Sequence, residues 1–382
     1  MIRWFIKYGF VLLLFNTIFY SIDATKDNIA PFIFYAVMSL GLLSLLFNPQ
    51  QTKLVLFHRS FLFLLILNLI NLTYYLFLDD IFHQPSFQYL IARFTQFSII
   101  SFAVYYNQEY FKFRFFLHLV YFIMLVVVLG LVIYPNIFID RYSGIIWNPN
   151  MLASLTVIAF SVLLLQNRKK SFLEILSLVL LFIIAFSTGS RSVILAIGLA
   201  FLFKYRFSLR NALHAFIAII MTTFILSIDL DTSINRISSG SLLDDRLDQY
   251  SFALENISKK LYTGYGLDEY SGFPSESLEM VLIKHEGEFI AAHNGYLTIL
   301  IQYGIIFGII VILIILIQSI RYILLYRGTE DYNRIYMYIV VYTLVAGMFE
   351  SLFTGINEFQ TLLFWFSLSM ISFHQYNLSS ND

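Results

Sequence analysis

The chain has 382 residues, of which 59% are hydrophobic and only 13% charged, and its formal net charge at pH 7 is zero. A soluble domain carries about 25% charged residues, so this composition excludes a water-soluble globular protein and indicates a membrane protein. The zero net charge gives no electrostatic case for nucleic acid as a partner, and the lack of cysteine in the sequence excludes disulfides and thiolate metal sites.

Long apolar segments follow one another along the chain. A helix needs about 20 apolar residues to cross a bilayer core, and these segments lack the alternating pattern of a membrane β-barrel. We therefore predict an all-α polytopic membrane protein, with residues 1–382 forming a single integral membrane domain. About twelve spans are expected, at 4–22, 30–47, 58–78, 87–106, 115–134, 150–166, 172–187, 190–204, 211–228, 293–319, 335–353 and 359–376.

The lysines and arginines predict the orientation of these spans, because short cytoplasmic loops are enriched in both. With the N-terminus in the cytoplasm, fifteen of these residues lie in inner loops, and the short outer loops hold only Lys26, Arg141 and Arg191. The C-terminus then returns to the cytoplasm. The segment 229–292, between the ninth and tenth spans, becomes a large extracytoplasmic loop.

Arg93 lies about six residues into the fourth predicted span, on its outer side. A charge at that depth is costly, so it predicts a functional contact by default. The alternative is a structural arginine that reaches the interface or donates to a backbone carbonyl.

The outer segment that begins at Arg141 leads into the sixth span through Asn148, Pro149 and Asn150. Asparagine followed by proline is typical of the first positions of a helix, which explains the asparagines without any function. That explanation does not extend to an arginine in a short outer loop. Arg141 is therefore a candidate for binding an anion, with Asn150 beside it.

Arg191 is the stronger candidate of the two. It follows the turn Ser187-Thr188-Gly189-Ser190 and opens the eighth span. Backbone N–H groups at a helix start, together with an adjacent arginine, form a good anion site.

The segment 229–292 contains 12 of the 24 acidic residues and five basic ones. Ser241 and Asp244 have the spacing of a capping box, and apolar residues then recur at helical intervals, which predicts a helix. The apolar residues are Leu243, Leu247, Tyr250, Leu254 and Ile257. Arg236 and Arg246 could each contact an anion, although their spacing from nearby aspartates favours ordinary ion pairs on a solvated face.

His293 stands where apolar sequence resumes, followed by Asn294 and Tyr296. A histidine at the interface suits proton transfer or a phosphate contact, and it could equally be a satisfied structural side chain. The sequence contains no HExxH and no P-loop. We therefore expect no metal and no cofactor, and expect the outer arginines themselves to neutralise an anion such as a lipid pyrophosphate.

Taken together, these pieces resemble the bacterial O-antigen ligase and O-antigen (repeat-unit) polymerase superfamily of membrane glycosyltransferases. The resemblance covers roughly residues 141–308 in motifs and the whole chain in its number of spans. The matching motifs are Arg141-x-x-Gly144 with Asn148-Pro149-Asn150, Thr188-Gly189-Ser190-Arg191, Arg246 followed by Gly264-Tyr265-Gly266, His293-Asn294-Gly295-Tyr296-Leu297, and Tyr303-Gly304-Ile305 with Gly308.

The resemblance implies a GT-C-like fold in the bacterial cytoplasmic (inner) membrane, with the active site on the extracytoplasmic side. It implies a donor of oligosaccharide linked to undecaprenyl pyrophosphate, contact with membrane lipids, and chain-length regulator and flippase proteins as partners. By the same analogy, Arg191 and Arg246 bind the pyrophosphate and stabilise the leaving group, while His293 positions or deprotonates the acceptor. The expected substrate contacts are Arg93, Arg141, Asn150, Arg236, Asn294 and Tyr296.

The leading hypothesis is a repeat-unit polymerase for a surface polysaccharide, O-antigen (lipopolysaccharide) or capsule. The alternative is an O-antigen ligase, whose acceptor is lipid A core or a protein. A glycolipid transporter is a third reading, and the clustering of polar residues at the outer face argues against its central pathway.

Overall fold

The structure is a computed structural model that describes residues 2–137, 141–205, 242–272, 292–325 and 331–379. These residues form helices and loops, and their one β interaction is an isolated bridge between Ile22 and Ile146. The all-α class predicted from the sequence is thereby confirmed.

Helices occupy every predicted span that lies within the described residues. They are α1 (Ile2–Tyr20), α3 (Ile29–Phe47), α5 (Leu62–Phe77), α6 (Gln84–Phe113), α7 (Phe115–Ile133), α8 (Pro149–Leu165), α9 (Phe172–Ser187), α10 (Ser192–Tyr205), α15 (Gly295–Leu325), α16 (Asp331–Ala346) and α17 (Phe359–Ser379). The shorter elements are α2 (Asp23–Lys26), α4 (Pro49–Leu56) and η1 (Arg59–Phe61), and the acidic segment contributes the helix α13 (Leu242–Lys259). The predicted span 211–228 lies outside the described residues.

Within the described residues, four helical segments are both long and apolar enough to cross a membrane, namely Ile29–Phe47, Arg59–Phe77, Phe115–Ile133 and Gly295–Leu325. Several further helices are as apolar but shorter, α8, α9 and α10 among them. The membrane character of the chain is therefore supported, while the count of twelve spans stays a prediction.

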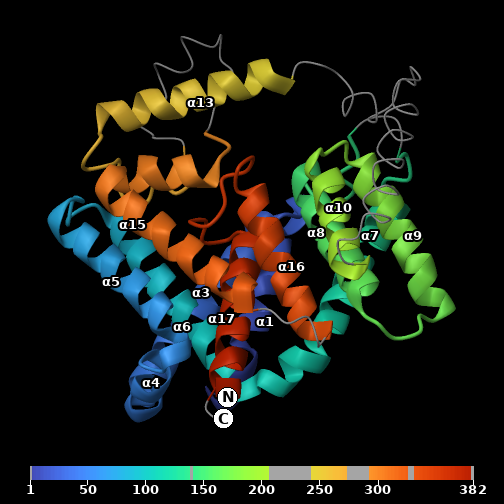
Figure 1. The fold of residues 1–382 in the computed structure, drawn as a ribbon, viewed down its shortest axis with the longest axis horizontal. Coiled ribbons are helices and arrows are strands. Elements are labelled where there is room, and N and C mark those ends of the chain that lie inside the picture. The colour runs from blue at the N-terminus through green and yellow to red at the C-terminus, as the bar shows by residue number, and fades with distance from the viewer. Residues whose placement is uncertain (1, 138–140, 206–241, 273–291, 326–330, 380–382) are drawn as a thin grey trace.

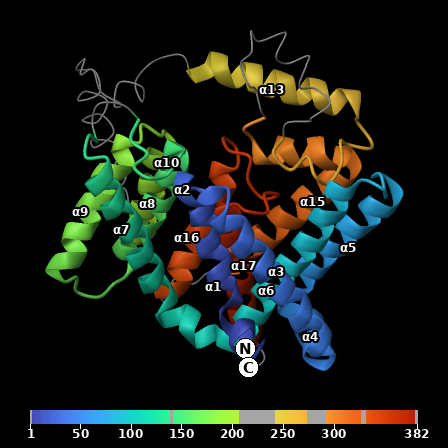
Figure 2. The same cartoon turned by 180° about the vertical axis from the view of Figure 1, so that it is seen from behind.

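The helices run between two ends of the molecule. Both termini lie at one end, and α13 lies across the other, which we call the distal end (Figures 1 and 2). Helices α7 to α10 form one group, α3 to α6 and α15 form another, and α1, α16 and α17 stand between them. The described parts of the predicted outer loops lie toward the distal end (Figures 1 and 2), and the orientation of the spans across a membrane stays a prediction.

The core centres on α17, which is buried on all sides. Leu362, Phe364 and Phe366 are fully buried, because α17 packs against α1, α6, α15 and α16. A helix that is hydrophobic all round is one surrounded by others. By contrast, Phe172 and Leu173 of α9 are exposed, as expected for side chains that face lipid.

Helix α15 is broken, although the sequence predicted a continuous span over 293–319. Gly304 has φ +68 and ψ 178, so the chain turns there between two helical pieces. A break leaves backbone carbonyls without their helical partners. Here Ile301 and Gln302 accept hydrogen bonds from the N–H groups of Tyr265 and Gly266, at 2.9 and 3.2 Å.

The loop after α13 closes this break from outside the helix. Gly264 packs so closely against Gln302 and Gly304 that an added Cβ would lie 2.4 Å from backbone atoms of both. The Tyr74 hydroxyl of α5 also donates to Gln302 O, at 2.9 Å. The motifs that contain Gly264 and Gly304 therefore have a structural explanation. The two backbones pack directly against each other, and a side chain at either glycine would not fit.

Helix α13 confirms the helix predicted from the capping box, but its buried face differs from the predicted stripe. Leu254 is 58% exposed, whereas Phe252, Ala253 and Ile257 are buried. The reason is tertiary: Ala253 and Ile257 pack against Ile301 of α15, and this contact sets which side of the helix faces inward.

Candidate functional site at the distal end

Arg141 is anchored to the turn between α9 and α10. Its Nε donates to the Thr188 carbonyl at 3.1 Å, and its Nη2 donates to Asn150 Oδ1 at 2.6 Å. The N–H of Tyr142 donates to the Ser187 carbonyl at 3.0 Å. The structure therefore brings together Arg141, Asn150 and the turn that carries Arg191. We call residues 187–191 together with Arg141 the arginine turn.

Arg191 directly precedes α10 and is half-buried. The turn before it is held by its own polar groups: Ser190 N–H donates to Thr188 Oγ1 at 3.2 Å, and Gly189 has a φ of +63. The positive end of a helix dipole and two arginines thus converge on one turn. Such an arrangement stabilises an anion, and it is fixed before any ligand binds.

Asn148 and Pro149 form the start of α8 as predicted. The Asn148 side chain accepts the N–H of Asn150 at 2.8 Å, so the backbone of Asn150 belongs to the helix cap. Its side chain is engaged by Arg141. Asn150 therefore orients an arginine of the turn.

His293 lies just before α15 and is half-buried. Its φ is +39, a value that is uncommon for a residue other than glycine and that is found at strained, over-determined positions. Asn294 caps the helix, because its Oδ1 accepts the N–H groups of Tyr296 and Leu297, both at 3.0 Å. The Tyr296 hydroxyl donates to Leu344 O at 2.8 Å. Asn294 and Tyr296 therefore fix the start of α15, which directly follows His293.

One carbonyl joins this corner to α13. Met348 O accepts from Asn294 Nδ2 at 3.1 Å and from the Tyr250 hydroxyl at 3.0 Å. Arg246 lies one turn before Tyr250 in α13, so its backbone stands near the corner of His293. The side chain of Arg246 and the whole of Arg236 lie outside the residues whose placement the structure describes.

Helix α16 links this corner to the arginine turn. It packs against α8 and α10 along its length, and the residues after its distal end contact those around His293. Gly347 O accepts the N–H of Gly295 at 2.7 Å. The two groups of predicted site residues thus lie on either side of one helix end.

Arg93 has a different setting. It is only 2% exposed, and its guanidinium donates to the carbonyls of Thr354 and Gly355 and to the Tyr89 hydroxyl. Gln96, one turn further along α6, donates to Ile356 O. Of the two readings of Arg93, this geometry favours the arginine paired with backbone carbonyls. It holds residues 351–358, which we call the clamp loop, onto α6.

Sequence reasoning missed a carboxylate at the end of this loop. Glu358 directly precedes α17 and accepts a hydrogen bond from the Thr361 hydroxyl. Burial raises the pKa of Glu358 to about 7. The loop is strained, because Phe353 has φ +82 while fully packed. The signal in the sequence is a pair of glutamates, Glu350 and Glu358, between two apolar segments.

A second distal contact joins the α5–α6 loop to the loop after α13. His83 Nε2 lies 3.0 Å from Asp268 Oδ2, and Ser86 Oγ donates to Asp268 Oδ1 at 2.9 Å. The bond to Asp268 raises the pKa of His83 above its ordinary value.

A groove of about 560 Å³ opens between α3 and α6. Its wall is mainly apolar, with Phe34, Met38 and Ala92, and its distal end is polar, with Asp268 and Asn357. Its size lies in the usual range for a ligand pocket. Among the residues that the structure describes, no group of three potential metal ligands occurs.

No curated protein gives a significant match to the chain. A family model described as O-antigen ligase matches residues 176–313, a range that contains Arg191, Arg246 and His293. The match supports the motif-based resemblance to the O-antigen ligase and repeat-unit polymerase superfamily, over residues 176–313 of the chain.

Proposed function

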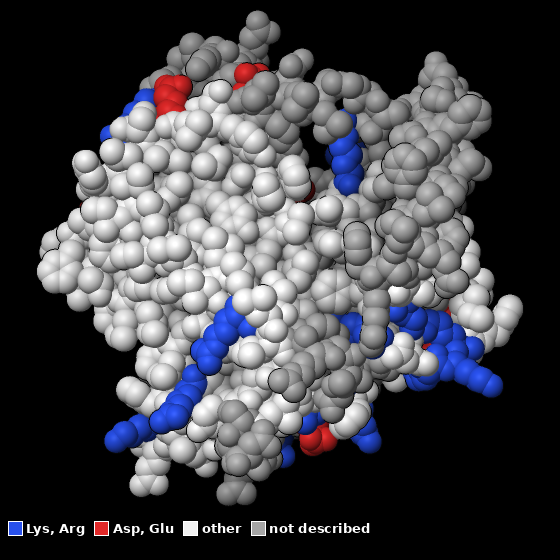
Figure 3. All heavy atoms as spheres, in the orientation of Figure 1, with Lys and Arg blue, Asp and Glu red and all other residues white. Residues whose placement is uncertain are grey.

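We propose that the protein is a polysaccharide repeat-unit polymerase that transfers a glycan from polyprenyl pyrophosphate to a lipid-linked repeat unit. The observation that carries the proposal is the arginine turn: Arg141 donates to Thr188 O in the turn that carries Arg191, and this turn precedes α10 within the matched range. On the face that Figure 3 shows, the lysines and arginines of the described residues gather mainly toward the opposite end, and few lie near the distal end.

In this reaction the protein must stabilise the leaving group, accept a proton from the acceptor and bind the hydrocarbon chain of the substrate. The acceptor hydroxyl attacks the anomeric carbon, the bond from that carbon to the pyrophosphate oxygen breaks, and polyprenyl pyrophosphate leaves with the electron pair. Negative charge therefore grows on the leaving group, and arginines placed in advance stabilise it. Arg191 and Arg246 take this role in the proposal, with Arg141 supporting them.

The hydroxyl must also lose its proton. His293 is proposed to accept it, because its rigid surroundings would hold the ring in a fixed position at the corner beside α16. Asn294 and Tyr296 act by fixing the backbone of His293. Glu358 is a carboxylate on the same distal end that can bind sugar hydroxyls.

The substrate's hydrocarbon chain requires an apolar site open to lipid. The groove between α3 and α6 supports this part of the proposal, since its wall is apolar and its polar end faces the distal side. The proposed location is the bacterial cytoplasmic membrane, with the distal end extracytoplasmic and chain-length regulator and flippase proteins as partners.

An O-antigen ligase is the second candidate, because the matching family model is described as O-antigen ligase. The two functions share the donor and differ in the acceptor. Glycan profiling of a deletion strain separates them. If the protein is a polymerase, the deletion strain should accumulate single repeat units on the lipid carrier. If it is a ligase, the strain should accumulate long polymer on that carrier, and this result would overturn the first assignment.

Purified protein tests the alternative that the chain is a transporter that catalyses no glycosyl transfer. Conversion of lipid-linked substrate to longer product requires an enzyme. Movement of intact glycolipid across vesicles, without product, would identify a transporter and remove the proposed reaction.

A further inference from the structure

Four polar side chains lie close together in the helix packing beside the arginine turn, and the proposed function has given them no role. They come from α8, α10, α16 and α17, and α16 packs against each of the other three helices. The four side chains, which we call the polar ring, are those of Ser154, Ser192, Tyr342 and Gln360. The Tyr342 hydroxyl faces the other three. Ser154 Oγ also donates to Gln360 Oε1 at 3.4 Å.

Two members connect the polar ring to the arginine turn. Ser192 directly follows Arg191 in the chain, and its hydroxyl lies 2.9 Å from the hydroxyl of a serine in the turn. Ser154 lies one helical turn after Asn150, so both lie on the same face of α8. The Asn150 side chain in turn accepts from the Arg141 guanidinium. The polar ring therefore adjoins the proposed anion site on two sides.

Gln360 carries a polar group that the fold does not satisfy. The residue is only 5% exposed, and its Nε2 has no hydrogen-bond partner among the residues that the structure describes. Most buried polar groups in folded proteins are paired, because an unpaired one has lost its water without replacement. The amide therefore indicates an acceptor that a ligand brings to the polar ring.

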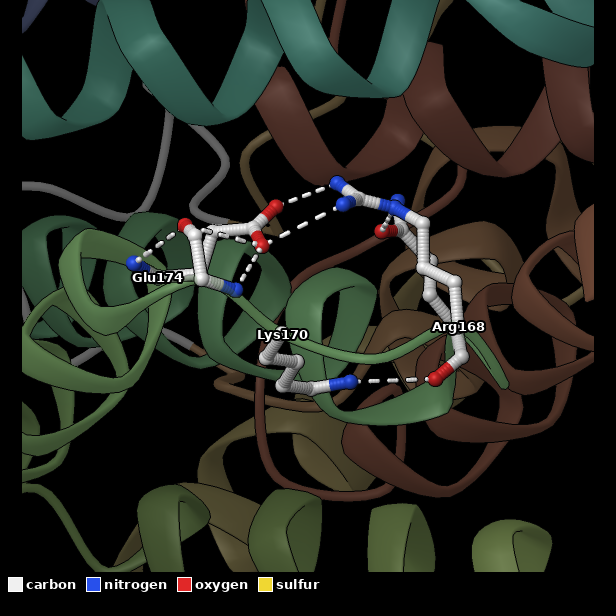
Figure 4. Close-up of polar contacts among 5 residues, drawn as sticks. Arg168, Lys170 and Glu174 are labelled. Carbon is white, nitrogen blue, oxygen red and sulfur yellow. Dashed lines mark hydrogen bonds and ion pairs between the residues drawn. The ribbon is translucent and has the colours of Figure 1, made fainter.

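The opposite end of α8 shows the usual situation in this fold. In the loop between α8 and α9, the Arg168 guanidinium donates to both carboxylate oxygens of Glu174 (Figure 4). Glu174 Oε2 also accepts the N–H of Ser171 at 2.8 Å. These groups are partly exposed and yet pair within the protein, whereas the enclosed amide of Gln360 does not. The contrast supports a ligand contact at Gln360.

The chemistry of the polar ring indicates which part of a ligand it binds. Its three hydroxyls and its amide are neutral, and each can both donate and accept a hydrogen bond. Sugar hydroxyls have the same property, whereas a phosphate is bound best by charged donors such as those of the adjoining arginine turn. A glycosyl pyrophosphate contains both parts, joined by one bond.

We propose that the polar ring binds the sugar that is attached directly to the pyrophosphate of the donor. Tyr342 and Gln360 contact hydroxyls of that sugar, and the arginine turn holds the pyrophosphate beside it. The anomeric carbon then lies between the polar ring and the arginine turn, where the bond to the leaving oxygen breaks. This inference rests on the proposed function, because it assigns a second part of the same substrate.

The test is native mass spectrometry of the full-length protein in detergent with two probes. One is the lipid-linked glycan extracted from a deletion strain, and the other is polyprenyl pyrophosphate without sugar. Wild type should bind the glycosylated lipid more tightly. Gln360→Met should lose roughly fivefold in affinity for that lipid, the effect of one hydrogen bond, and should bind polyprenyl pyrophosphate as wild type does. Its melting temperature should not fall, because the lost donor has no partner in the fold.

Tyr342→Phe is the second variant, and Tyr338→Phe is its matched control. Tyr338 lies one turn away on α16, and its hydroxyl already donates to Ala196 O at 3.1 Å. Tyr342→Phe should lower the preference for the glycosylated lipid about as much as Gln360→Met. Tyr338→Phe should keep the wild-type preference.

Four results would overturn the inference. Equal affinity of wild type for the two lipids would exclude a sugar site and leave the pyrophosphate site in place. Equal losses for both lipids in Gln360→Met would mean that the polar ring only shapes the arginine turn. Wild-type affinities in both Gln360→Met and Tyr342→Phe would mean that the amide binds a water molecule. Binding of neither lipid by wild type would overturn the proposed function, and the sugar site with it.

Discussion

Arg93 and Arg191 both belong to distal segments of the helices, yet their surroundings are opposite. Arg93 is enclosed, and its guanidinium donates to carbonyls of the clamp loop. Arg191 is half-buried beside a helix start, with Arg141 anchored to the same turn. An arginine at depth can therefore serve the fold, whereas one at a partly open helix start is placed to serve a ligand. Loss of the first should reduce stability, and loss of the second should reduce activity.

The largest effect is expected from Arg191→Ala. Removing a single charge placed for the leaving group should lower polymer formation by at least about 100-fold, the size of effect seen when one preorganised donor is removed. Membrane levels of the protein should stay normal. Gel profiles of surface polysaccharide from complemented deletion strains measure the loss, with Lys53→Gln as a control outside the site. Full-length polymer in the Arg191 variant would take the residue out of the donor site.

His293→Ala should have the next largest effect on activity, roughly 100-fold or more if the ring accepts the proton. Lipid-linked substrate should still bind, because the arginine turn is intact. Turnover and substrate binding by the purified variant separate these two effects. Unchanged turnover would leave His293 with a structural role at the start of α15.

On the structural side of the comparison, Gly304→Ala should destabilise the fold by about 2–3 kcal/mol, because alanine is strained at positive φ. An added Cβ would also lie 2.6 Å from Tyr262 O. Gly198→Ala is the matched control, since it lies in α10 with nothing within 4 Å of the added atom. Thermal unfolding in detergent measures both. Equal melting temperatures for the two variants would show that the break in α15 tolerates a side chain.

Arg93→Met should cost roughly 1–3 kcal/mol, because it leaves buried carbonyls of the clamp loop without donors. The melting temperature should fall while the activity of the remaining folded protein changes little. A stable Arg93→Met protein without activity would reverse the comparison and return Arg93 to the substrate site.

The smallest effect concerns pH. The pKa of His83 is raised in the folded protein by its bond to Asp268. The stabilisation is therefore fully present below the unfolded value of about 6.5 and is lost as the pH rises through the folded pKa. Because the His83 side chain is 45% exposed, the contribution is only a few tenths of a kcal/mol. His83→Gln should lower the melting temperature at pH 5.5 and not at pH 8.5, and an equal shift at both would exclude the ion pair.

Hydropathy was sufficient to predict the membrane helices. The backbone N–H and C=O groups of an apolar segment must hydrogen-bond within that segment, whatever surrounds it. The capping residues Asn148 and Pro149 likewise act locally, and the start of α8 confirms them. The break at Gly304 could not be predicted, since its carbonyls are satisfied by a loop about 40 residues earlier in the chain. For the same reason, the buried face of α13 includes Phe252 and Ala253, which lie outside the predicted apolar stripe.

The candidate site shows the same division between features set by the local sequence and features set by distant contacts. Arginines in a short outer loop were visible from topology rules, and the structure does bring Arg141 to the turn of Arg191. The roles of Asn150, Asn294 and Tyr296 depend on partners distant in the sequence, and the structure gives each a hydrogen bond that positions its neighbours. Whether Arg246 joins them stays a prediction, as does the assignment of Arg236.

The central claim is that the arginine turn holds the leaving pyrophosphate. Its most direct measurement is release of polyprenyl pyrophosphate by purified protein in nanodiscs supplied with the lipid-linked repeat unit. The account predicts that wild type releases it together with a lengthened glycan, that Gly198→Ala does the same, and that Arg191→Ala releases almost none. Equal release by wild type and Arg191→Ala would contradict it.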